Sequence, residues 1–168
     1  MPTDATLTAH RRTANTRALV ALMRLNRSPM VAIIAGASAF AAGAGVGRAL
    51  WMALAGFCLA VGGFSLDLYA DRDLDAAGPR AERRHNPFAA GVLTPRAGLA
   101  FSITFILISL ALVIALFPSA LLVWGIILAI IIGLALHAFE TPLARALTLG
   151  ALQALYALMG SMAGRLNG

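Results

Sequence analysis

The sequence of 168 residues has little charge, one cysteine and no lysine. Charged residues make up 12% of it, whereas soluble domains contain about 25%, so an ordinary soluble fold is excluded. The single cysteine, Cys58, excludes an intrachain disulfide and a cysteine-based zinc cluster. A disordered or collagen-like chain is excluded as well, because so apolar a chain would not stay solvated as coil.

Apolar residues dominate the composition, at 60% of the chain. The net charge is +6, and every one of the 13 basic residues is arginine. Such a charge could suggest nucleic acid, but a chain this hydrophobic indicates a lipid bilayer first, and no nucleic-acid partner is expected. The sequence therefore predicts an integral membrane protein.

Apolar stretches recur along the chain, each near the ~20 residues that cross ~30 Å of hydrocarbon. They are interrupted at Gly47–Arg48, at Phe117–Ser119 and before Pro142, which suits the first turn of a helix. We expect an all-α polytopic helical bundle with about five transmembrane helices. Their predicted ranges are 29–47, 49–66, 98–117, 119–137 and 146–163.

Arginine is distributed unevenly between the two sides of these spans. A tail over 1–27 holds five arginines, and a polar loop over 67–97 in the transmembrane domain, 28–168, holds five more. With Arg145, 11 of the 13 arginines lie on one side. The positive-inside rule predicts a multi-pass protein of the inner (cytoplasmic) membrane, with the N-terminus and the 67–97 loop in the cytoplasm.

Small residues recur at four-residue spacing in the first predicted span, at Ala39, Gly43 and Gly47. A stripe of small side chains lets two helices approach closely in lipid. We interpret it as plain helix packing.

Acidic side chains gather where the second predicted span ends. Asp67, Asp71 and Asp75 follow one another at four-residue spacing, so they share one face of a helix, whereas Asp73 points elsewhere. Stacked carboxylates repel unless a cation lies between them, and Mg²⁺ with substrate phosphates suits them. The alternative is a solvated helix end balanced by nearby arginines. Acids that continue an apolar span are costly without a function, which favours the metal site.

Arginines follow the aspartates in the same loop. Arg80, Arg83, Arg84 and Arg96 could bind a pyrophosphate, because the guanidinium fork matches phosphate geometry. Their alternative role is to anchor the loop in the cytoplasm. His85 has no second histidine or cysteine at ligand spacing, and it is interpreted as a surface residue.

The chain resembles the UbiA superfamily of intramembrane prenyltransferases. That family has a motif N-D-x-x-D-x-x-x-D at the cytoplasmic end of its second helix, and the matching run here is D-L-Y-A-D-R-D-L-D at 67–75. The run N-P-F-A-A-G-V-L-T-P-R at 86–96 is similar to the family's R-P-L-P-S-G element. The turn T-P-L-A-R at 141–145 is similar to its P-L-K-R segment. The resemblance spans about residues 20–163.

Several positions depart from the family pattern. Asp67 stands where the family has Asn, and Leu68 where it has the first Asp. Asn86, Ala89 and Ala144 replace Arg, Pro and Lys. Family members have about nine helices and a second aspartate motif that binds another Mg²⁺, so the resemblance covers their N-terminal half.

The resemblance implies Mg²⁺-dependent transfer of a prenyl group from a polyprenyl diphosphate to an acceptor, often aromatic. It implies that Asp71 and Asp75 are catalytic and that Asp67 helps them to hold the metal. Phosphate oxygens would be bound by Arg80, Arg83, Arg84 and Arg145. With one motif, the site would be completed by a second copy or by another membrane subunit. The alternative is a non-catalytic, shortened paralogue that acts as a structural or accessory subunit.

Overall fold

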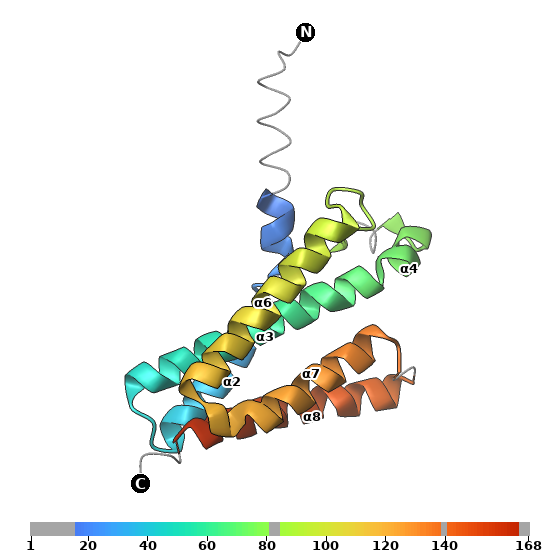
Figure 1. The fold of residues 1–168 in the computed structure, drawn as a ribbon. Helices are drawn as coiled ribbons and strands as arrows, with labels where there is room; N and C mark the ends of the chain where they lie inside the picture. Colours follow the sequence, from blue (N-terminus) through green and yellow to red (C-terminus); the bar gives the residue numbers. More distant parts are fainter. Residues whose placement is uncertain (1–15, 81–84, 139–140, 165–168) are drawn as a thin grey trace, which may run out of the picture.

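The computed structural model describes residues 16–80, 85–138 and 141–164 of the chain. Within these ranges the chain forms helices and turns and contains no strand. The main helices run back and forth alongside one another (Figure 1), which confirms the predicted all-α membrane bundle. Their bounds are α2 Ser28–Ala41, α3 Val46–Ala70, α6 Pro95–Leu116, α7 Leu121–Ala135 and α8 Pro142–Gly164. Two short elements are α4, Arg72–Ala77, and the 3₁₀ turn η1, Pro118–Ala120.

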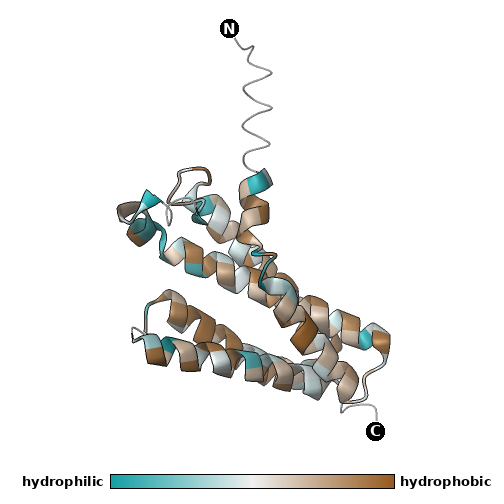
Figure 2. Cartoon of the chain, turned by 180° about the vertical axis from the view of Figure 1, so that it is seen from behind, coloured by the Kyte–Doolittle hydropathy of each residue, from teal (hydrophilic) through white to brown (hydrophobic). Residues whose placement is uncertain are grey.

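Four helical segments in the described part of the chain are long and apolar enough to cross a membrane. They are α3, α6, η1 with α7, and α8, of 25, 22, 18 and 23 residues. With 14 residues, α2 is shorter than the predicted first span. At 1.5 Å per residue it is about 21 Å long, less than the hydrocarbon thickness of ~30 Å. In Figure 2 hydrophobic residues predominate along the long helices, and hydrophilic residues gather around α4.

A glycine turn ends α2 earlier than the sequence analysis predicts. Gly43 has a φ of +95°, the left-handed conformation that glycine adopts most easily. The Ala44 N–H donates to the Ala39 carbonyl and the Gly43 N–H to that of Phe40, which is a Schellman motif. Gly47 consequently belongs to α3, and the predicted small-residue stripe along one helix is wrong.

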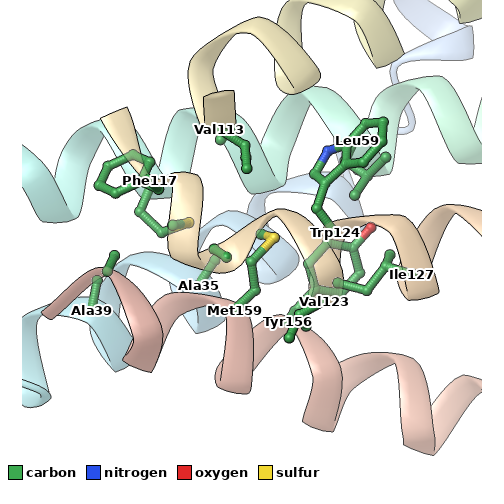
Figure 3. Close-up of a cluster of buried hydrophobic side chains, with 14 of the residues drawn as sticks. Ala35, Ala39, Leu59, Val113, Phe117, Val123, Trp124, Ile127, Tyr156 and Met159 are labelled. Carbon is green, nitrogen blue, oxygen red and sulfur yellow. The ribbon is translucent and has the colours of Figure 1, made fainter. Parts of the chain in front are cut away.

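The closest helix contacts are made by other glycines. A Cβ atom built on Gly160 of α8 would lie 2.2 Å from the Ala35 carbonyl oxygen of α2, and one on Gly36 would lie 2.8 Å from the Ala53 Cβ of α3. Helix α2 therefore lies tightly between α3 and α8. Figure 3 shows the buried side chains around this contact, including Ala35 and Met159. Close backbone approach of this kind replaces the hydrophobic effect as the source of helix association in lipid.

Buried hydrogen bonds also join the helices. The Ser109 hydroxyl of α6 donates to the Ala55 carbonyl of α3 at 2.8 Å and accepts from the Trp124 indole N–H of α7 at 2.9 Å. Ser102 of α6 donates to the Gly62 carbonyl of α3 at 2.6 Å. These bonds satisfy polar groups that would be costly without a partner at this depth.

A second, smaller core lies at the aspartate end of α3. Residues 16–22 are helical, and Ala18 and Leu22 are buried there against Leu68, Phe88 and Leu93. The segment before α2 therefore packs beside the end of α3 and the loop that follows it. This packing places Arg24 and Arg27 near the aspartates.

Candidate functional site

The three predicted metal ligands lie on consecutive helical turns, and each contacts a different part of the fold. Asp67 is in the last turn of α3, Asp71 lies between α3 and α4, and Asp75 is on α4. Asp73 is 83% exposed and pairs with Arg72 at 3.2 Å, as expected for a residue on another face. Among the described residues, no group of three His, Cys, Asp or Glu side chains is placed to hold a metal ion. The structure therefore contains no complete metal cage made of protein ligands in the ranges it describes.

Asp71 is the aspartate most influenced by its neighbours. Burial raises the pKa of its carboxyl group, and the negative charges of Asp67 and Asp75 raise it further. His137 and Arg145 oppose this rise. The Asp71 Oδ1 atom lies 3.4 Å from His137 Nε2. Two nearby carboxylates disfavour the ionised form of a third, so a bound cation would relieve this repulsion.

His137 reaches Asp71 from an unusual backbone position. It follows the end of α7 with a φ of +56°, where a Schellman motif usually has glycine. Its N–H donates to the Leu134 carbonyl, and the Ala138 N–H donates to that of Gly133. The left-handed conformation costs a non-glycine residue roughly 1–2 kcal/mol. The sequence analysis missed His137, because nothing near it in sequence indicates a partner 66 positions away.

Asn86 holds the side chain of the third aspartate, Asp75, in position. Its side chain is completely buried, and its Nδ2 atom donates to the Leu68 carbonyl at 2.7 Å and to Asp75 Oδ2 at 2.8 Å. Its Oδ1 atom accepts from the Phe88 N–H at 3.0 Å. This one amide joins the end of α3, α4 and the following loop. The Asn86–Pro87 pair could have indicated a turn, but not these partners.

Arginines that precede the aspartates in the sequence, and others that follow them, lie near them in the fold. Arg145 of α8 lies 3.8 Å from Asp67 Oδ1, which brings together two residues predicted to act in one site. Arg80 is exposed and pairs with no acid in the described part of the chain, and Arg83 and Arg84 lie outside the described residues. Arg24 was missed. Burial and a neighbouring arginine lower its pKa, and the charges of all three aspartates oppose that effect.

A cavity of about 300 Å³ opens beside this cluster, between α2, α3, α7 and α8. Its rim carries Arg27, Asp67 and Arg145, whereas its walls are mainly aliphatic and aromatic. Farther along α8, Gln153 and Tyr156 also line it. In Figure 1 the α7–α8 pair diverges from α3 towards the α4 end, where these rim residues lie. The arrangement suits a ligand with an anionic head and an apolar body.

The fold and cavity define a multi-pass, all-α membrane protein with a charged entrance to an apolar site. The model of the UbiA prenyltransferase family matches residues 28–168, so the chain belongs to this family. It is a membrane prenyltransferase-like protein, of a kind that handles polyprenyl substrates in lipid. Searches of curated proteins and of solved structures found no match.

Proposed function

We propose that the chain binds a polyprenyl diphosphate with Mg²⁺ at the aspartate end of α3 and takes part in prenyl transfer to an acceptor. The observation that supports this most strongly is the cavity that begins at Asp67, Arg27 and Arg145 and continues between apolar helices. A diphosphate fits the charged rim, and an isoprenoid chain fits the apolar walls. Membership of the family supports the same class of substrate.

The donor set fits Mg²⁺ only in combination with a substrate. Mg²⁺ in proteins is commonly held by one or two carboxylates, and water and phosphate oxygens complete the octahedron. Asp67 and Asp71 lie one helical turn apart and near the rim, with Asp75 on the next turn. We propose that these aspartates would hold the metal as one or two ligands rather than as a cage of three, because no three acidic side chains are placed as a cage in the described ranges. Bound there, Mg²⁺ would supply positive charge that neutralises the diphosphate.

The chain's own cations would hold the diphosphate oxygens. Arg145 and Arg27 both line the rim, and each guanidinium can donate two parallel hydrogen bonds to a phosphate. Arg145 lies 3.8 Å from Asp67, so binding of a cation by Asp67 would free Arg145 to turn towards the phosphates. Arg80, Arg83 and Arg84 remain proposed phosphate ligands in the adjoining loop.

The proposal is tested by the metal dependence of ligand binding. Purified chain in mild detergent should bind farnesyl diphosphate in a calorimeter with Mg²⁺ present. Excess EDTA should weaken binding by at least roughly tenfold, the equivalent of about 1.4 kcal/mol. Geranylgeraniol, which lacks the diphosphate, serves as a control whose binding should not respond to Mg²⁺. Equal binding of farnesyl diphosphate with and without the metal would contradict the proposal.

The arginine distribution, together with the fold, supports a proposed orientation in the membrane. The end of α3, α4 and the start of α8 lie at one end of the bundle (Figure 1), and Arg24, Arg27 and Arg145 lie near Asp67 at this end. We propose that it faces the cytoplasm of the inner membrane. The α2–α3 turn then faces the opposite side.

Cysteine labelling checks this orientation. In a Cys58→Ser background, Gly45→Cys in the α2–α3 turn should react with an impermeant maleimide added outside intact cells. Ala77→Cys, at the aspartate end, should react only after the membrane is permeabilised. Both positions are exposed, so accessibility within the fold does not distinguish them. The reverse labelling pattern would place the aspartates outside and refute the proposed orientation.

One observation favours the alternative of a non-catalytic structural or accessory subunit. Each aspartate already contacts a protein partner, namely Arg145, His137 and Asn86. In a structural subunit these contacts would simply tie the ends of α3, α7 and α8 together. This alternative predicts no response of stability or binding to Mg²⁺. A second copy of the chain or another membrane subunit would then be the partner, and the mass of the purified complex would reveal it.

A further inference from the structure

Two polar side chains lie far from the charged rim, on the α8 wall of the cavity. Gln153 and Tyr156 are three residues apart, so they share a face of α8, and both line the cavity. Their Cα atoms lie about 12 Å and about 16 Å from that of Arg145 along the helix, at 1.5 Å per residue. They are therefore well inside the bundle. The proposed diphosphate site does not use either side chain.

Both side chains lack a hydrogen-bond partner. The Gln153 Oε1 atom is buried without one in the described part of the chain. Tyr156 is 3% exposed and lines the cavity, and within the same ranges its hydroxyl group makes no hydrogen bond with the protein, although it is not one of the fully buried unpaired atoms. Figure 3 shows Tyr156 among buried apolar side chains that include Ile127 and Val123. Tyrosine hydroxyls that are buried usually have a partner.

The missing partner of the Gln153 oxygen is expensive in this environment. A buried polar group without a hydrogen bond costs about 1–3 kcal/mol, and the nearby walls offer no compensation. Other buried polar groups of the bundle, such as Ser102 and Ser109, are fully paired with protein atoms. Ser65 Oγ and Arg48 Nε are also buried without a partner in the described ranges, but neither residue lines this cavity, whereas Gln153 and Tyr156 do. Polar side chains retained within a membrane span commonly mark a binding site.

We propose that Gln153 and Tyr156 form a hydrogen-bonding subsite for the hydroxyl-bearing end of an uncharged, apolar ligand. A hydroxyl group both donates and accepts, so it satisfies the glutamine amide in either orientation and the tyrosine hydroxyl as well. A plain hydrocarbon would leave both groups unpaired, and a charged group would be too costly to bury here. The subsite does not require that the rim bind a diphosphate.

A pair of matched probes tests this subsite. The probes are 4-propylphenol and 4-propyltoluene, which have nearly the same shape but differ in a hydroxyl or a methyl group. Each is titrated into the full chain in mild detergent, without Mg²⁺ or diphosphate. Thermal unfolding is followed by labelling of Cys58, which is buried in the folded chain. The phenol should raise the unfolding midpoint at concentrations at least roughly tenfold lower than the toluene, the equivalent of about 1.4 kcal/mol.

Two substitutions test whether Gln153 and Tyr156 cause the preference for the phenol. Tyr156→Phe and Gln153→Leu should each reduce the preference for the phenol severalfold and leave binding of the toluene unchanged. Ser161→Ala is the control, because Ser161 lies on α8 outside this cavity and bonds only to the Leu158 carbonyl. Equal affinity for the two probes in the wild-type chain would overturn the proposal. A preference that persists in both variants would overturn it as well. Because the assay contains no metal, its failure is separate from failure of the proposed diphosphate site.

Discussion

Replacing Asp71 by alanine is expected to abolish Mg²⁺-dependent binding of farnesyl diphosphate. Asp71 lies between Asp67 and Asp75, and a bound cation would relieve the repulsion among the three carboxylates that His137 and Arg145 only partly offset. Loss of an outer-shell partner alone costs a metal site 10–100-fold in affinity, so loss of a direct ligand should cost at least about a hundredfold. Calorimetric titration with and without EDTA measures the effect.

The neighbouring aspartate Asp73 provides the matched control. It is 83% exposed and, within the described ranges, pairs with Arg72 alone, so Asp73→Ala should change binding less than about twofold. Asp75→Ala should also abolish the metal effect, although it additionally breaks the contact with Asn86. Asn86→Ala separates these two causes, because it removes the contact but keeps the carboxylate. Similar, weak effects of Asp71→Ala and Asp73→Ala would identify the run as a solvated helix end.

Replacing Gly160 by alanine is expected to produce the largest loss of stability among conservative changes in α8. The added Cβ would lie 2.2 Å from the Ala35 carbonyl oxygen and 3.0 Å from the Ser38 Cβ, so α2 and α8 would have to separate. Backbone atoms cannot turn aside as a flexible side chain can. Overpacking of this kind costs about 1–3 kcal/mol, and we expect the upper end of that range.

The control for this substitution is Gly150 on the same helix. A Cβ atom added there has no neighbour within 4 Å, so Gly150→Ala should leave stability unchanged or raise it slightly. Unfolding by SDS in mixed micelles, followed by circular dichroism, would compare the two variants. If Gly160→Ala were as stable as Gly150→Ala, α2 and α8 could not approach each other as closely as described.

The sequence by itself determined the fold class and the position of the aspartates. In lipid, every backbone polar group must be satisfied within its own segment, so long apolar runs form helices whatever their partners. A local signal also indicated one helix start, because α8 begins at Pro142 as expected, whereas α6 begins at Pro95, three residues before the predicted span. The four-residue spacing of Asp67, Asp71 and Asp75 is equally local, since it depends only on helical periodicity.

The sequence analysis placed the end of the first span at residue 47, whereas α2 ends at Ala41. The apolar run continues through Gly43, and hydropathy does not record the left-handed turn that this residue forms. The glycines that do allow close packing, Gly36 and Gly160, could not be told from the others by spacing. Which glycine meets a neighbouring backbone depends on how the helices cross, and the pattern along one helix does not contain that information.

The tertiary structure alone decided what surrounds the aspartates. Arg145, His137 and Asn86 approach them from three separate segments, and Arg27 joins the rim from before α2. Hydrogen bonds and ion pairs act over only a few ångströms, so they depend on how distant segments pack. The same holds for Gln153 and Tyr156, which are ordinary residues of an apolar helix in the sequence. They line a cavity because residues of α2, α3 and α7 face the same side of α8.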